Sequence, residues 1–125
     1  MSKLILIIDD EEDVKAIAKM GLEMAANWEV ITASSGQEGL NLAAEKQPDV
    51  ILLDLMMPDW DGKETVKQLK NHPDTADIPV ILMTAKTQSA ISTELKQLDI
   101  VGVVTKPFRP LQLPETIQTI LTKKG

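Results

Sequence analysis

The sequence at residues 49–54 is Asp-Val-Ile-Leu-Leu-Asp, four consecutive aliphatic residues between two acids. A short aliphatic run of this kind is typical of a strand that is buried on both faces of a sheet. Similar runs lie on either side of it in the chain, at residues 3–8 and 79–83. Because doubly buried strands occur in parallel sheets covered by helices, these three runs predict an α/β fold.

Segments with helical spacing alternate with these strands. Two further strand-like segments, residues 28–33 and 100–104, complete a set of five. Apolar residues recur at helical spacing within residues 14–25, 35–45, 61–72, 91–98 and 113–121. Ser35 with Glu38, and Asp61 with Glu64, have the spacing of helix N-terminal caps. Five strands that alternate with five helices predict a (βα)5 architecture with right-handed crossovers. The start of the last helix is left open between Pro110 and Pro114.

The composition narrows the functional classes. The chain has 125 residues, a size that fits one domain, and it contains no cysteine, which excludes disulfides and thiolate metal sites. A net charge of −6 argues against binding to a nucleic acid backbone. No apolar run approaches the roughly 18 residues of a membrane span. The acids at residues 9–13 directly follow the first apolar run, which does not suit a signal peptide, so we expect a cytoplasmic protein without a membrane partner.

Polar residues follow four of the five predicted strands. Parallel strands bring their carboxyl ends to one edge of the sheet, where ligands bind in such folds. The residues expected at this edge are Asp9 and Asp10, Asp54, Thr84 and Ala85, and Lys106 and Pro107. Clustered carboxylates repel one another unless a cation lies between them, and ligation by oxygen alone suits Mg²⁺. A carboxylate can act as a phosphoryl-accepting nucleophile, and a metal and a lysine can neutralise the transferred group. The sequence therefore predicts a site where an aspartate is phosphorylated.

The same motifs resemble those of the receiver domains of two-component response regulators. The matching stretches are residues 6–10, 49–58, 61–62, 83–85 and 105–108, and the resemblance extends from Lys3 to about Leu121. It implies a flavodoxin-like three-layer sandwich around a five-stranded parallel sheet of order 2-1-3-4-5. It also implies one stand-alone receiver domain over residues 1–125, with a core at about 3–121 and no output domain. Such a protein is a signalling switch rather than a metabolic enzyme.

The resemblance assigns a metal site and a phospho-acceptor. Asp54 is the expected acceptor and also a Mg²⁺ ligand. Asp10 is expected to bind the metal directly, Asp9 to hold the metal or its waters, and the backbone carbonyl of Met56 to complete the protein ligands. Glu11 and the two acids after it are better explained as a first helical turn favoured by the helix dipole.

The resemblance also assigns residues that respond to the phosphoryl group. Lys106 is expected to contact it, Thr84 to hydrogen-bond it and move on activation, and Pro107 to follow a cis peptide bond. Val103 stands where the family usually has an aromatic residue, which puts the usual readout in doubt. The implied partners are a sensor histidine kinase or a histidine phosphotransfer protein upstream and an unidentified protein downstream.

Two other functions are weighed against this hypothesis. A phosphohydrolase of the haloacid dehalogenase type would need a second Asp two positions after the nucleophile, where this chain has Met56. A receiver-like binding module that acts without phosphorylation is favoured only by Val103. Trp60 is predicted either to pack over the rim of the site or to be exposed for a partner, and the sequence does not choose.

Overall fold

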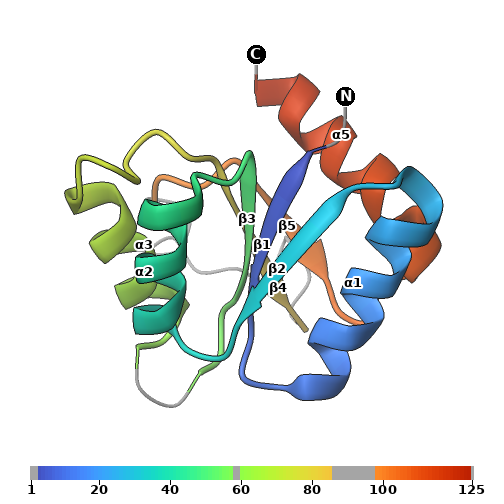
Figure 1. Ribbon diagram of the computed structural model, residues 1–125, viewed down its shortest axis with the longest axis horizontal. Coiled ribbons are helices and arrows are strands. Elements are labelled where there is room, and N and C mark those ends of the chain that lie inside the picture. The colour runs from blue at the N-terminus through green and yellow to red at the C-terminus, as the bar shows by residue number, and fades with distance from the viewer. Residues whose placement is uncertain (1–2, 58–59, 86–97, 125) are drawn as a thin grey trace.

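A computed structural model of the chain describes residues 3–57, 60–85 and 98–124. The strands form one parallel sheet in the order β2-β1-β3-β4-β5, with α1 and α5 on one face and α2 and α3 on the other (Figure 1). The predicted layers and strand order are confirmed, and residues 91–97 of the helix predicted at 91–98 lie outside the described residues. The bounds are β1 Leu4–Ile8, α1 Glu12–Ala26, β2 Glu29–Ala33, α2 Gly36–Lys46, β3 Val50–Asp54, α3 Gly62–Asn71, β4 Val80–Thr84, β5 Gly102–Thr105, a 3₁₀ turn η2 Pro110–Gln112, and α5 Leu113–Lys124.

The core consists of two apolar layers that share the strands. Successive side chains of a strand point to opposite faces, so Ile5 and Ile7 pack in the layer beneath α1 and α5, whereas Leu6 and Ile8 pack in the layer beneath α2 and α3. The four aliphatic residues of β3 divide in the same way and are all fully buried. The aliphatic runs therefore anchor the centre of the sheet and fix where each strand ends.

The strand bounds differ from the predicted ones by one or two residues, and two of these differences bear on the site. Asp54 is the last residue of β3, aligned with Met83 of β4, rather than the first residue of a loop. The fifth strand covers Gly102–Thr105 instead of 100–104, because the pairing of β4 with β5 runs from Ile81–Gly102 to Thr84–Thr105. The carboxylate of Asp54 is thus attached to a rigid, fully buried strand.

The predicted caps form. The Ser35 side chain accepts a hydrogen bond from the Glu38 amide, and that of Asp61 accepts one from Glu64. Glu38 bonds back to the amide of Ser34 rather than that of Ser35, so the reciprocal bond lies one residue before the cap. The sequence leaves the start of the last helix open between two prolines. In the structure, the turn η2 begins at Pro110, and Pro114 lies in the first turn of α5. In the described parts of the chain, no helix combines the length and the apolar character that crossing a membrane requires.

Candidate functional site

Asp9 and Asp54 lie side by side at the carboxyl edge of the sheet. Asp9 directly follows β1, Asp54 ends β3, and these adjacent strands are aligned with Ile8 opposite Leu53. The Asp9 amide donates to the carbonyl of Ala33, which ties the turn to the end of β2. The exposed fractions of Asp9 and Asp54 are 0% and 3%. The fold therefore holds two carboxylates together with almost no water around them.

Lys106 joins the two aspartates. Its Nζ lies 3.2 Å from Asp9 Oδ2 and 3.1 Å from Asp54 Oδ1, and its side chain is only 17% exposed. The backbone amide of Lys106 donates to the carbonyl of Thr84 over 2.7 Å, so the end of β4 positions this residue. The Lys106–Pro107 peptide bond is cis, as predicted. One ammonium thus bridges carboxylates that are 97 and 52 residues away in sequence.

Burial and the neighbouring charges shift the pKa values of Asp54 and Lys106. Burial, followed by the nearby charge of Asp9, raises the pKa of the Asp54 carboxyl above its usual value, and the bond to Lys106 only partly offsets this rise. Burial by itself lowers the pKa of the Lys106 ammonium. The hydrogen bonds and charges of Asp54 and Asp9 outweigh burial, and the pKa of Lys106 is raised. The negative charge on Asp54 is therefore undercompensated, which favours a further cation at this place.

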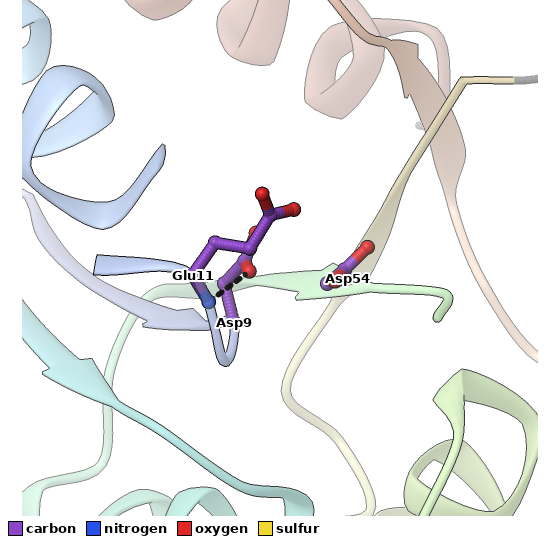
Figure 2. Close-up of side chains that lie close together, drawn as sticks. All are labelled: Asp9, Glu11 and Asp54. Atoms are coloured by element: carbon purple, nitrogen blue, oxygen red, sulfur yellow. Dashed lines mark hydrogen bonds between the residues drawn. The ribbon is translucent and has the colours of Figure 1, made fainter. Parts of the chain in front are cut away.

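Glu11, rather than Asp10, contributes the third nearby carboxylate. Among the described residues, Asp9, Glu11 and Asp54 offer oxygen atoms within 4.8 Å of one another. Figure 2 shows the three side chains at one edge, with the Glu11 amide donating to Asp9 Oδ1 over 2.8 Å. Asp10 is exposed and does not belong to this group, so its role as the direct metal ligand stays a prediction. The sequence favours a helix-dipole interpretation of Glu11, because spacing alone cannot tell which of several adjacent acidic side chains turns toward the site.

The other predicted residues also lie at this edge. Thr84 ends β4 and is 4% exposed. The amide of Met56 donates to Asp54 Oδ1 over 3.3 Å, while its side chain is exposed. Val103 lies opposite Leu82 and packs partly buried in the layer beneath α2 and α3. Thr84 and the backbone of Met56 thus lie near Asp54, whereas Val103 packs in the core.

A buried lysine that the sequence did not single out fixes the start of α1. Lys15 is 5% exposed, and its Nζ contacts Glu12 Oε1 at 2.8 Å and the Ser34 hydroxyl. These bonds tie the first turn of α1 to the loop after β2. The side chain of Glu11, directly before that turn, is therefore held at the edge of the site. A lysine in an amphipathic helix carries no sequence signal for burial of this kind.

A hollow of about 350 Å³ opens beside the carboxylates. Its lining residues are Glu11, Val14, Ile17, Ala85, Lys106, Pro107 and Phe108. Trp60 is not among them. A Cβ added at Gly36 would lie 3.0 Å from the Trp60 Cβ, so this half-buried tryptophan packs against the start of α2. The hollow is thus mostly apolar, with Glu11 and Lys106 as its charged residues.

The donors present fit a small divalent cation. Carboxylate oxygens are the ligands that Mg²⁺ prefers, and Mg²⁺ commonly keeps several waters and pairs with phosphate. The three carboxylates are close enough for one hydrated ion, and burial, followed by the charge of Asp9, raises the pKa of Asp54. The site can therefore bind a hard cation next to a carboxylate held on a rigid strand.

A doubly wound parallel sheet with paired aspartates and a lysine at its carboxyl edge defines an aspartate-centred, cation-binding class of α/β domain. The chain belongs to the response regulator receiver domain family, whose model matches residues 5–118. Receiver domains of two-component systems are signalling switches that take a phosphoryl group from histidine kinases or phosphotransfer proteins and bind Mg²⁺ at an acidic site.

Curated relatives are longer than this chain. It is 34% identical over 125 residues to the phosphate regulon transcriptional regulatory protein PhoB of Pseudomonas aeruginosa, and covers 54% of that protein. It is 36% identical over 123 residues to the alkaline phosphatase synthesis transcriptional regulatory protein PhoP of Bacillus subtilis. That alignment covers 98% of this chain and 50% of PhoP. The chain thus spans about half the length of these relatives, and its predicted stand-alone organisation stays a prediction.

Solved structures of full receiver length also match. The chemotaxis response regulator CheY4 of Vibrio cholerae superposes with a TM-score of 0.87 at 30% identity, covering 96% of this chain and 99% of that one. A putative response regulator from Chloroflexus aurantiacus gives a TM-score of 0.84 at 30% identity, with 98% and 99% covered. The fold and the family are therefore established.

Proposed function

We propose that Asp54 accepts a phosphoryl group from a phosphohistidine in a Mg²⁺-dependent reaction, and that the phosphorylated domain signals through altered contacts with another protein. The observation that carries this proposal is the bridging of Asp9 and Asp54 by Lys106 at 3.2 and 3.1 Å. An acceptor carboxylate, a second acid and an ammonium at one buried edge are the groups that phosphoryl transfer to an aspartate requires.

Each residue has a distinct part in the proposed reaction. An Asp54 oxygen attacks phosphorus, the bond from phosphorus to the imidazole nitrogen breaks, and the imidazole leaves with its electron pair. Lys106 already contacts Asp54, so its ammonium is placed to neutralise a phosphoryl oxygen as charge moves. Thr84, at the adjacent strand end, is proposed to donate its hydroxyl to another oxygen.

The proposed metal ligands are Asp54, Asp9, Asp10 and the carbonyl of Met56. When bound, Mg²⁺ would supply the positive charge that the carboxylates lack and would draw the phosphoryl oxygens to them. Asp9 is fixed by its bonds to Lys106 and to the Glu11 amide, so it can orient either the metal or its waters. The hydrogen bond from the Met56 amide to Asp54 keeps the backbone of Met56 close to the site.

Exposed apolar side chains on α1 and η2 support a protein as the phosphoryl donor. Ile17, Met20 and Met24 on α1, and Leu111 on η2, are four of the five exposed large hydrophobic side chains in the described part of the chain. Ile17 also lines the hollow next to Lys106. Exposed apolar groups that continue from a site along one helix indicate a docking surface, and a small metabolite would not need one of this extent.

Incubation of the protein with acetyl phosphate and Mg²⁺ tests the proposal. Intact-mass spectrometry is expected to show one added phosphoryl group, which should be absent in Asp54→Asn and when EDTA replaces Mg²⁺. Equal labelling of the wild type and Asp54→Asn would refute Asp54 as acceptor.

The alternatives predict different results. Sustained turnover of a chromogenic phosphomonoester would favour the phosphohydrolase. A tryptophan fluorescence signal that does not respond to beryllofluoride at millimolar Mg²⁺ would favour the phosphorylation-independent binding module, with Trp60 as the nearest reporter in the chain.

A further inference from the structure

Glu11 lies at the border between the buried carboxylates and the open hollow. Its carboxylate is 3.7 Å from Lys106 Nζ, and its side chain is 62% exposed, whereas Asp9 and Asp54 are buried. It lines the hollow together with Lys106. In the part of the chain that the structure describes, it is the one member of the three-carboxylate group that faces solvent.

This position places a negative charge on the approach to the site. A phosphoryl oxygen in contact with the Lys106 ammonium, at about 3 Å, would lie within roughly 7 Å of the Glu11 carboxylate, the sum of that contact and the measured separation. Like charges at this distance repel each other appreciably even in water, and the repulsion doubles for a doubly charged donor. A protein donor can bring lysine or arginine side chains that offset the repulsion, but a small phosphorylated metabolite cannot.

We infer that Glu11 is a specificity-determining residue, whose charge slows phosphorylation by small doubly charged donors and so favours a protein donor. The inference rests on the proposed function of Asp54. It concerns the approach of the donor rather than the chemical step. The effect should therefore appear in the second-order rate constant and should weaken as salt screens the charge.

The chain provides a matched control in the next residue. Glu12 is also acidic and is more exposed, with an 82% exposed side chain, but it pairs with Lys15 at 2.8 Å instead of facing Lys106. Glu11→Gln and Glu12→Gln therefore remove the same charge from adjacent positions. The amide oxygen of Gln at position 12 can still accept from Lys15, so the control keeps the contacts that fix the start of α1. Glu11→Lys reverses the charge and provides a graded second variant.

The experiment measures phosphorylation rates with acetyl phosphate, which is doubly charged at neutral pH, and with phosphoramidate, which carries a single net charge. At low salt, Glu11→Gln should accelerate the acetyl phosphate reaction about 3- to 10-fold and the phosphoramidate reaction less, and Glu11→Lys should accelerate both further. In 0.5 M salt, where the screening length is about 4 Å, the gain should fall below about twofold. Glu12→Gln should stay within about twofold of the wild type throughout.

Separate results would overturn the inference and the proposed function. The inference fails, while the proposed function stands, if the wild type is labelled but Glu11→Gln reacts no faster than Glu12→Gln. It also fails if the acceleration in Glu11→Gln does not depend on salt concentration. Calorimetry of Mg²⁺ binding gives an independent readout: a loss of affinity beyond about tenfold in Glu11→Gln would make Glu11 a metal ligand instead. If the wild type is labelled by neither donor, the proposed function fails.

Discussion

Replacement of Lys106 by methionine removes the one ammonium that bridges Asp9 and Asp54. Methionine preserves most of the apolar length of the side chain, so the change is mainly one of charge. Two carboxylates that are 0% and 3% exposed would then face each other with only the backbone amides of Glu11 and Met56 as partners among the contacts described. Without a metal, the substitution should therefore destabilise the fold.

The expected size follows from the burial of the pair. Removing one partner of a fully buried ion pair costs about 3–5 kcal/mol. Because the Lys106 side chain retains 17% exposure, water can relieve part of this cost, and we expect about 2–4 kcal/mol at neutral pH. A domain of this size loses roughly 3–5 °C of melting temperature per kcal/mol, so the midpoint should fall by about 10 °C.

Mg²⁺ should reverse most of this loss. Without Lys106 the carboxylates attract a cation more strongly, so the metal should bind the variant more tightly than the wild type and stabilise it more. A ligand at 100 times its dissociation constant adds about 2.7 kcal/mol. Urea unfolding followed by circular dichroism, in EDTA and in saturating Mg²⁺, measures both effects.

Lys46→Met is the matched control for this experiment. Lys46 pairs with Glu45 at 3.6 Å on the surface, with both side chains more than half exposed, and its loss should change stability by less than about 0.5 kcal/mol. A Lys106→Met cost below about 1 kcal/mol in EDTA would refute the bridging role. So would a stabilisation by Mg²⁺ that is equal in the variant and the wild type.

Three further predictions follow from other contacts. Since the pKa of Asp54 is raised in the folded state, the free energy of unfolding should fall as pH rises from about 4, the unfolded pKa, through the raised pKa. In EDTA, Asp54→Asn should therefore have a higher melting temperature than the wild type at pH 7, but not below about pH 4. The opposite order of melting temperatures would contradict this prediction. Gly21→Ala should destabilise by at least about 1–3 kcal/mol despite better helix propensity, because its Cβ would lie 2.1 Å from the Pro110 carbonyl oxygen; an unchanged urea midpoint would show that α1 does not pack there. Ser35→Ala should cost about 1 kcal/mol in the same assay through loss of the α2 cap, and a cost near zero would rule out the Glu38 amide bond.

Much of the fold and part of the site are predictable from local patterns. Aliphatic runs at residues 3–8, 49–54 and 79–83 predict the central strands, and parallel pairing brings Asp9, Asp54 and Lys106 to one edge. Strand ends are less predictable because they depend on the pairing partner. Asp54, for example, belongs to β3 since Met83 of β4 lies opposite it.

Local sequence patterns are enough to identify the buried strands and the acids that follow them, because burial on two faces leaves a continuous aliphatic run in the chain. Tertiary packing, in contrast, brings Glu11 rather than Asp10 to Asp9 and Asp54, and buries Lys15 against Ser34. Adjacent acidic residues in a turn carry the same chemical group and differ only in the direction in which their side chains point. That direction is set where α1 meets the loop after β2, a contact between segments that no local pattern records.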